Sequence, residues 1–335
     1  MTDFPELTDL AAERLGGAVI DSNDEFFAPR DALLKATPAE WREGAYTERG
    51  KWMDGWETRR RRTPGHDWCV VRLGCPGVIR GIVVDTAFFR GNYPEECSVE
   101  ACSVPAPPHP VLLASTEVEW TEIVPRSPLQ GDTANLFPVD APGRFTHVRL
   151  RIYPDGGVAR LRVHGEVVPQ WTRFARAGGE VDLAAMENGG WVVVCSDMFF
   201  GHRQNLILPG RSLFMGDGWE TRRRRGPGHD WTIVRLGTPG TLHRVELDTD
   251  HFKGNAPGRC ALEAIHAPGA MSVELTDAGA PWTPLLAETP LQPHARHRFE
   301  DLLPAGEATH VRLSIFPDGG VARLRLFGVL SPTAR

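Results

Sequence analysis

The chain has 335 residues, enough for about two domains that each bury a core. Its net charge of −6 argues against a nucleic-acid-binding role, because such proteins usually carry a basic footprint. No apolar run is long enough to cross a bilayer and the N-terminus has no apolar signal core, so we expect a cytoplasmic protein with no membrane partner.

An internal duplication begins near the N-terminus, where Asp9-Leu-Ala-Ala is matched 173 positions later by Asp182-Leu-Ala-Ala. From Asp54 onward the offset is 163, so the first copy holds ten extra residues. These fall within residues 38–51, which open with Pro-Ala-Glu-Trp. That opening predicts a short helical insertion.

The clearest repeat is a stretch of fifteen residues at 54–68, Asp-Gly-Trp-Glu-Thr-Arg-Arg-Arg-Arg-Thr-Pro-Gly-His-Asp-Trp, which returns at 217–231 with a change only at Thr63, to Gly226. Identity of this length, with rare Trp and His residues, does not arise from composition. The chain is therefore a tandem duplication, and we place the two domains at residues 1–170 and 171–335.

Alternation of apolar and polar residues indicates strands throughout each copy. Val148-Arg-Leu-Arg-Ile alternates, a Pro-Asp-Gly-Gly turn follows, and Val158-Ala-Arg-Leu-Arg-Val continues the pattern. Further short strands are predicted at 68–73, 78–85 and 98–103. About eight strands per copy without long helices favour an all-β fold, either a sandwich or a jelly roll.

The six cysteines do not follow the duplication, because only Cys97 and Cys260 occupy equivalent positions. A disulfide framework would be expected to repeat with the domain. We therefore expect reduced, mostly packing thiols.

The arginine run is the first candidate for chemistry. In a strand, Glu57, Arg59 and Arg61 would share one face, and two guanidinium groups there could bind a carboxylate. Glu220, Arg222 and Arg224 are the equivalents in the second copy. The alternative is a solvated charge ladder, or arginines that pair with nearby acids and hold the loop.

A histidine and an aspartate follow the arginine run in each copy, as His66-Asp67 and His229-Asp230. The histidine could act as general acid or base with an acidic partner. The structural alternative is equally open: the aspartate caps the turn and the histidine binds the backbone.

The two copies differ in the loops at 85–92 and 248–255, where Ala87-Phe88 becomes Asp250-His251. The second copy gains two titratable groups, so it is the better candidate if only one copy is active. The same loops supply further polar candidates, although Gly-Asn is also an ordinary turn signal; these are Asn92, Lys253 and Asn255. Arg323 is a secondary candidate on a later strand.

No spacing typical of a metal site is present. His229, Asp230, Asp250 and His251 could still be brought together around an ion. We therefore assign no cofactor and no metal ligand, and leave a divalent ion such as Mn²⁺ open.

Taken together, these motifs resemble those of the allantoicase family. The resemblance rests on the two copies of the fifteen-residue stretch, on Asp-Thr-x-x-Phe-x-Gly-Asn after each, and on the later Pro-Asp-Gly-Gly-Val-Ala-Arg. It covers about residues 16–328. It implies two tandem jelly-roll β-sandwich domains similar to galactose-binding modules, and hydrolysis of a C–N bond in allantoate to give (S)-ureidoglycolate and urea during purine breakdown.

Allantoate carries one carboxylate and two ureido groups, so its site needs cations, amide-recognising groups and a proton donor. The expected catalytic candidates are His229, Asp230, Glu220, Asp250, His251, His66, Asp67 and Glu57. The expected substrate-binding candidates are Arg222, Arg224, Asn255, Lys253, Arg59, Arg61, Asn92 and Arg323. The alternative is a noncatalytic jelly-roll module that binds a small carboxylate or a sugar. As for most such enzymes, we expect a homo-oligomer.

Overall fold

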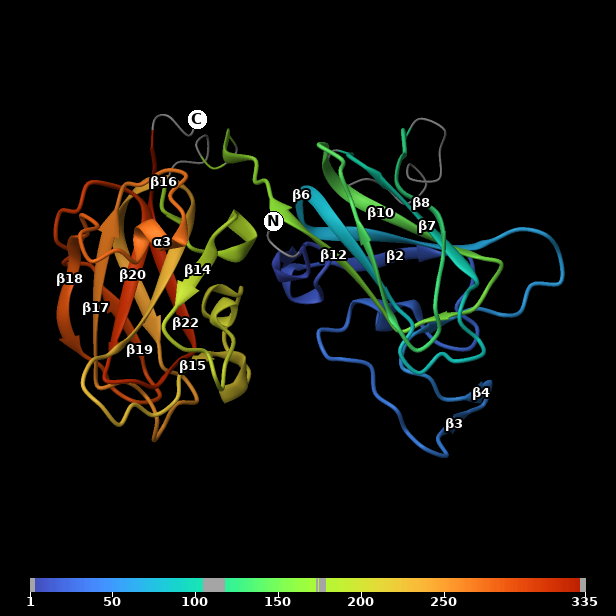
Figure 1. Ribbon diagram of the computed structural model, residues 1–335, viewed down its shortest axis with the longest axis horizontal. Coiled ribbons are helices and arrows are strands. Elements are labelled where there is room, and N and C mark those ends of the chain that lie inside the picture. Colours follow the sequence, from blue (N-terminus) through green and yellow to red (C-terminus); the bar gives the residue numbers. More distant parts are fainter. Residues whose placement is uncertain (1–3, 105–117, 173, 175–178, 332–335) are drawn as a thin grey trace. The chain divides into compact units, whose positions relative to one another are not determined.

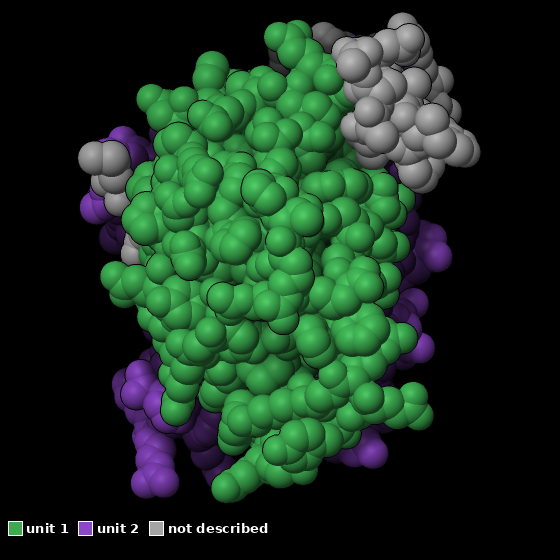
Figure 2. Space-filling view, turned by 90° about the vertical axis from the view of Figure 1, so that its right-hand side faces the viewer, with its two compact units in different colours: residues 1–168 green, residues 169–335 purple. Residues whose placement is uncertain are grey.

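The computed structural model describes residues 4–104, 118–172, 174 and 179–331. The chain forms two compact units, residues 1–168 and residues 169–335, which are coloured separately in Figure 2. The regular secondary structure of both units is almost entirely strand (Figure 1), so the all-β prediction is confirmed. In the part of the chain that the structure describes, no helix is long and apolar enough to cross a membrane.

Unit 1 is a jelly-roll β-sandwich organised around one long strand, β6 (Asp67–Asp85). Its first part pairs with β10 (Arg144–Tyr153) and β2 (Ala18–Ser22). Its second part pairs with β12 (Arg160–Val167) and β9 (Ala134–Pro138). A single strand therefore contributes to both layers of the sandwich.

The sequence predicted two separate strands at 68–73 and 78–85, and this was wrong. The strand continues through Pro76 without a turn. Neighbouring backbone packs closely against Gly74 and Gly77, where a side chain would not fit. A Cβ at Gly77 would stand 2.2 Å from the carbonyl oxygen of Glu166. The glycines thus mark close packing inside a strand and not its end.

The outer strands complete the unit. β7 (Glu96–Cys102) and β8 (Thr121–Pro128) follow β10, and β1 (Thr8–Asp9) follows β12. The alternation predicted for β10 is confirmed: Val148, Leu150 and Ile152 are fully buried and form part of the core. Burial of such alternate side chains supplies most of the driving force for the sandwich.

Unit 2 repeats this arrangement with the same order of strands. The long central strand is β16, and its partners carry the roles of those in unit 1. The strands are β13 (Val181–Asp182), β14 (Trp191–Cys195), β16 (Asp230–Asp248), β17 (Arg259–Ile265), β18 (Thr283–Pro290), β19 (Arg296–Phe299), β20 (Glu307–Phe316) and β22 (Arg323–Leu330).

Short elements connect and cover the sheets. In each unit, a two-stranded ribbon lies beside the sandwich: β5 (Trp56–Glu57) with β11 (Gly157–Val158), and β15 (Trp219–Glu220) with β21 (Gly320–Val321). The helical turns are η1 (Phe4–Glu6), η2 (Glu13–Leu15), η3 (Arg30–Leu34), η4 (Met186–Asn188), η5 (Arg203–Ile207), η6 (Met215–Asp217) and α3 (Ser272–Leu275).

The extra residues of the first copy form a hairpin and not the predicted helix. Strands β3 (Tyr46–Thr47) and β4 (Gly50–Lys51) pair with each other. Gly44 and Gly50 adopt positive φ angles of 67° and 143°, which a regular helix does not contain. We call residues 38–51 the insertion, and residues 46–51 its hairpin.

Candidate functional site

The arginine run lies in a loop rather than in a strand. Within residues 54–66 of the first copy, only Trp56 and Glu57 belong to a strand. The loop that follows them continues until β6 begins at Asp67. The backbone N–H of Arg61 donates to Asp155 in the Pro-Asp-Gly-Gly turn, at 2.8 Å. The predicted alternation of arginines between two strand faces was therefore wrong.

Within this loop the predicted clamp arginines pair with carboxylates of the same repeat. Arg59 binds Asp24 at 2.7 Å, and Arg61 binds the buried Asp67 at 2.6 Å. Asp67 also accepts a hydrogen bond from the side chain of Asn23 at 2.7 Å. Arg59, Arg61 and Asp67 thus hold the loop to the sandwich, which was the structural alternative.

The second copy repeats these ion pairs. Arg222 binds Asp197 at 2.8 Å, and Arg224 binds the buried Asp230. Asp230 also accepts a hydrogen bond from the hydroxyl of Ser196 at 3.0 Å. Arg222, Arg224 and Asp230 are therefore loop anchors in the same sense.

Neither histidine of the repeated stretch lines a described cavity. The His66 ring packs 5.2 Å from the ring of Tyr153, and the His229 ring packs 4.6 Å from that of Phe316. Burial and the nearby arginines, Arg151 foremost, lower the pKa of His66. These histidines pack against the aromatic residues that precede the two cis-prolines, at positions 154 and 317.

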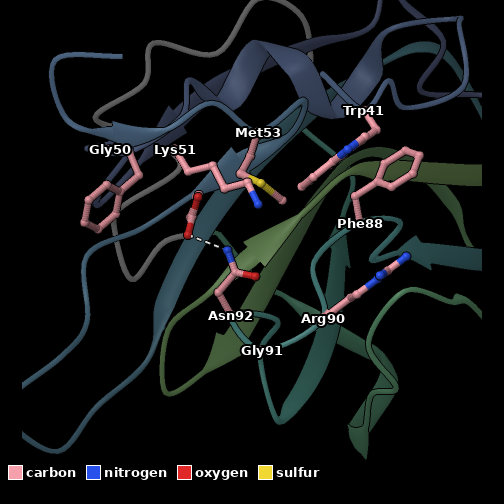
Figure 3. A pocket seen from close by; sticks show the side chains of 10 residues that line it. Trp41, Gly50, Lys51, Met53, Phe88, Arg90, Gly91 and Asn92 are labelled. Carbon is pink, nitrogen blue, oxygen red and sulfur yellow. Dashed lines mark hydrogen bonds between the residues drawn. The ribbon is translucent and has the colours of Figure 1, made fainter. Parts of the chain in front are cut away.

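A cavity of about 650 Å³ opens in unit 1 beside Glu57 (Figure 3). Its walls come from the β5 region, from the loop after β6 and from the insertion. The lining residues are Phe27, Trp41, Gly50, Lys51, Met53, Glu57, Phe88, Arg90, Gly91 and Asn92. A second cavity of about 420 Å³ shares Phe27, Glu57, Gly91 and Asn92 with it and extends toward Arg60 and Asp155.

Glu57 and Asn92 lie where the two cavities meet. The Asn92 side-chain amide donates a hydrogen bond of 2.7 Å to the Glu57 carboxylate, drawn as a dashed line in Figure 3. Burial raises the pKa of Glu57, and the hydrogen bond from Asn92 only partly opposes this. A carboxyl group of this kind retains a proton to higher pH than an exposed one, which suits a proton donor.

Two cations line the same cavity, and sequence reasoning missed both. The Lys51 ammonium lies 4.2 Å from the centre of the Trp41 ring, and Arg90 pairs with Asp132 at 3.0 Å. Arg90 occupies the position of Lys253, so the duplication could have identified it. Lys51 and Trp41 could not have been found this way, because they lie in the insertion.

The second repeat retains the central pair but not its surroundings. Asn255 donates to the buried Glu220 as Asn92 does to Glu57. Where unit 1 has Phe88, unit 2 has His251, whose ring contacts the Ser212 carbonyl oxygen at 3.0 Å. Lys253 is exposed.

Asp250 and His251, which were expected to mark the active copy, both contact other residues of unit 2. Asp250 binds Arg211 and His294, both at 2.8 Å. Burial opposes ionisation of Asp250, but His251, His294 and Arg211 outweigh it and hold its pKa below the usual value. These contacts hold the loops of unit 2 together, and they occupy the Asp250 carboxylate with two partners.

Arg323 is not available for a substrate. It is buried, pairs with the buried Asp217 at 3.0 Å and donates to the Ala322 carbonyl oxygen. Its equivalent Arg160 makes the same pair with Asp54 at 2.6 Å. The secondary candidate was therefore a structural residue, because strand β22 directs its first side chain into the core.

Over the described parts of the chain, no three His, Cys, Asp or Glu side chains are grouped so as to hold a metal ion. In particular, His229, Asp230, Asp250 and His251 form no such group. The residues present thus do not fit a Mn²⁺ site, and no catalytic step is assigned to a metal.

Comparison with known proteins gives one consistent result. The family model described as the allantoicase repeat matches twice, at residues 8–168 and 181–331. The chain is 48% identical to probable allantoicase 1 of Burkholderia mallei, covering 97% of this chain and 96% of that one. It is also 48% identical to a probable allantoicase of Pseudomonas aeruginosa, with coverage of 97% and 96%.

Solved structures agree with these relatives. The crystal structure of allantoicase from Saccharomyces cerevisiae superposes with a TM-score of 0.80 at 34% identity, covering 97% of this chain and 93% of that one. A second solved structure, described as allantoicase, gives a TM-score of 0.78 over 96% and 93% of the two chains.

Proposed function

The chain belongs to the allantoicase family and is a hydrolase of allantoate, and we propose that the cavity beside Glu57 in the first repeat is its active site. The observation that carries this proposal is the Glu57–Asn92 pair, which lies partly buried where two cavities meet. The equivalent pair in the second repeat lacks the walls that the insertion supplies. The reaction releases urea and leaves ureidoglycolate.

The substrate's chemistry assigns a role to each group. Allantoate has a carboxylate and two ureido nitrogens on one carbon. Lys51 and Arg90 are the cations that line the cavity, and we assign them to the carboxylate. The Asn92 amide can recognise a ureido group while its Nδ2 orients Glu57.

We assign the proton transfers to Glu57. Protonated Glu57 donates to one ureido nitrogen, and the C–N bond to the central carbon breaks as the lone pair of the other ureido nitrogen forms a C=N bond. Urea departs. Water then adds to the central carbon, and the Glu57 carboxylate accepts its proton, which restores the acid and gives ureidoglycolate.

This scheme replaces the arginine clamp expected from the sequence. Arg59 and Arg61 already pair with Asp24 and Asp67, so they are unsuited to bind a second carboxylate without losing the loop. Among the residues expected from the sequence, we assign only Glu57 and Asn92 to contact with the substrate. The other candidates either hold the loops of the first repeat or lie in the second repeat.

The test is urea release by purified protein from allantoate. Glu57→Gln, which cannot donate a proton, should lower kcat by about 10²- to 10⁴-fold. The matched change Glu220→Gln should leave kcat within about threefold of the wild-type value. A loss only in Glu220→Gln would move the active site to the second repeat, and equal losses in both variants would overturn its assignment to the first repeat alone.

The pH dependence provides a further check on Glu57. Its pKa is raised by burial, and only the protonated form donates. Activity should therefore be retained at a pH where an exposed glutamate is ionised, and fall as pH rises through the raised pKa. An activity that instead rises with pH across this range would assign Glu57 the role of base.

We also propose that the protein is cytoplasmic and forms a homo-oligomer. All six cysteines are free, and five of them are buried, which suits a reducing compartment. Closed homo-oligomers are the commonest assemblies of soluble enzymes. Sedimentation of the purified protein tests the second proposal.

A further inference from the structure

The two cavities that meet at Glu57 differ in charge. The titratable groups that line the first cavity are Lys51, Arg90 and Glu57. Those that line the second cavity are Arg60, Glu57, Glu95 and Asp155. Arg90 pairs with Asp132 at 3.0 Å, but Lys51 keeps the first cavity the more positive of the two. An anion is therefore favoured in the first cavity, and a neutral group with N–H donors is favoured in the second.

Main-chain hydrogen bonds fix the walls of the second cavity. The Thr58 N–H donates to the Gly156 carbonyl oxygen at 3.1 Å, and the Gly157 N–H donates to that of Asn92 at 2.7 Å. The turn lies too close for a side chain, since a Cβ at Gly156 would stand 2.8 Å from the Asn92 carbonyl oxygen. The Pro-Asp-Gly-Gly turn therefore holds Asp155 beside the loop that carries Asn92, and the cavity is preformed.

Two side chains of the second cavity are available to a ligand. Arg59 and Arg61 pair with carboxylates, whereas no described residue makes an ion pair or a hydrogen bond with the Arg60 side chain. Asp155 accepts the Arg61 N–H through Oδ2 at 2.8 Å, and its Oδ1 accepts from no described group. Arg60 can thus donate to an oxygen of a ligand, and Asp155 can accept from its N–H groups.

These two side chains match a ureido group. It is neutral, its carbonyl oxygen accepts from a guanidinium, and its N–H groups donate to a carboxylate. Glu57 lines both cavities. With the carboxylate of allantoate in the first cavity and a ureido group in the second, Glu57 lies beside the C–N bond that joins this ureido group to the central carbon.

We propose that the second cavity is the subsite of the leaving group, where Arg60 and Asp155 bind the ureido group that departs as urea. This inference rests on the proposed active site and extends it. The electron pair of the breaking C–N bond passes to the ureido nitrogen, which takes the proton of Glu57, so urea leaves as a neutral molecule. Negative charge that develops on the urea oxygen during cleavage is stabilised by the Arg60 guanidinium.

The proposal separates the kinetic effects of the cations in the two cavities. The Arg60 hydrogen bond strengthens as the leaving group gains charge, so Arg60→Met should lower kcat by about 10-fold. This loss is smaller than that of an enclosed oxyanion donor because Arg60 is exposed. The cations of the first cavity bind a carboxylate that does not react, so their removal should act on KM.

Inhibition by urea and by acetate tests the two cavities separately. Urea is used below about 0.2 M, which is too little to unfold a stable domain. Arg60→Met should raise the inhibition constant of urea at least about 5-fold, and Lys51→Met should raise that of acetate. Each variant should leave the other constant unchanged. Asp155→Asn, whose amide oxygen still accepts the Arg61 N–H, should also weaken inhibition by urea alone.

Two control variants remove an arginine that lines none of the described cavities. Arg62→Met changes the charge of the same loop, and Arg223→Met changes the equivalent of Arg60 in the second repeat. Both should keep the wild-type kcat and the wild-type inhibition constant of urea.

The outcomes distinguish this subsite from the active site itself. If Arg60→Met keeps both the kcat and the urea inhibition constant of the wild type, or weakens inhibition by acetate instead of urea, the subsite is wrong although Glu57 can still be the acid. If Glu57→Gln keeps a kcat near the wild-type value, the proposed active site is wrong and the subsite is wrong with it.

Discussion

The two repeats share a carboxylate–amide pair but surround it differently. Glu57 and Asn92 lie beside a cavity of about 650 Å³ walled by Trp41 and Lys51 of the insertion. Glu220 and Asn255 lie among exposed aromatic residues, with no insertion to cover them. The same local geometry therefore supports different roles, and ten inserted residues account for the difference.

The buried ion pair of Arg160 and Asp54 holds the insertion in place. The equivalent pair in the second repeat, Arg323 and Asp217, has no insertion to hold. Arg160 donates to the carbonyl oxygens of Thr37 and Pro38 at 2.9 and 3.1 Å, and to Asp54 at 2.6 Å. Asp54 in turn accepts from the backbone N–H of Glu40 at 3.0 Å. Both groups therefore fix the start of the insertion relative to the sandwich.

Breaking this network should give the largest effect. Arg160→Met leaves Asp54 buried with less compensation and should destabilise the first repeat by about 3–5 kcal/mol. Arg323→Met breaks the equivalent Asp217 pair and should cost the second repeat a similar amount. Only Arg160→Met should also lower kcat/KM, because only Arg160 holds the cavity wall.

Calorimetry and steady-state kinetics at a temperature well below both transitions measure these two effects. The comparison fails if both variants lose kcat/KM to the same extent while folded. Equal losses of kcat/KM would indicate that activity depends on the integrity of both repeats and not on the position of the insertion.

A second prediction concerns stability and pH, and it has the opposite sign to the usual salt-bridge expectation. Burial raises the pKa of Asp182 to about 6, although Arg325 and two backbone N–H groups oppose this. A carboxyl group with a raised folded-state pKa stabilises the fold at low pH and loses that contribution as pH rises through about 4 to 6.

Asp182→Asn should therefore match the wild type near pH 4 and exceed it above pH 6, by an amount on the order of 3 kcal/mol. Asp9, the equivalent residue of the first repeat, also has a pKa raised by burial, so Asp9→Asn should act in the same direction. Denaturation curves at several pH values measure the difference. A variant less stable than the wild type at pH 7 would show that the Arg325 contact outweighs burial.

Much of the fold could be predicted because the duplication and the alternating strands are local signals. The buried alternation of β10 is an example. The continuity of β6 through Pro76 could not be predicted, since it depends on backbone packing against Glu166 and not on local propensity. The hairpin of the insertion was missed for a similar reason. Its Pro-Ala-Glu-Trp opening resembles a helix start, but Asp54 and Arg160 hydrogen-bond its backbone and hold it in a non-helical conformation.

The candidate site was predicted only in part. Glu57 and Asn92 were found because both copies repeat them. The ion pairs of Arg59 and Arg61 depend on Asp24 and Asp67, and the sequence does not show that these distant acids are within reach. The difference between the copies at Asp250 gave the most misleading prediction of a site residue. The second copy that has this carboxylate also has Arg211 and His294, which pair with it.

The smallest expected effect concerns the two cations of the cavity. Lys51→Met and Arg90→Met should each raise KM by about 3- to 10-fold with little change in kcat, because a carboxylate that does not react is bound equally in the ground state and the transition state. The effect is modest because the Arg90 side chain is 78% exposed, and ion pairs in water contribute little. Lys253→Met, the equivalent change in the second repeat, should alter neither constant. Steady-state kinetics with allantoate decide the comparison: a rise in KM for Lys253→Met as large as that for Arg90→Met would show that the open pair at Glu220 also binds substrate, and that the insertion is not what separates the two repeats.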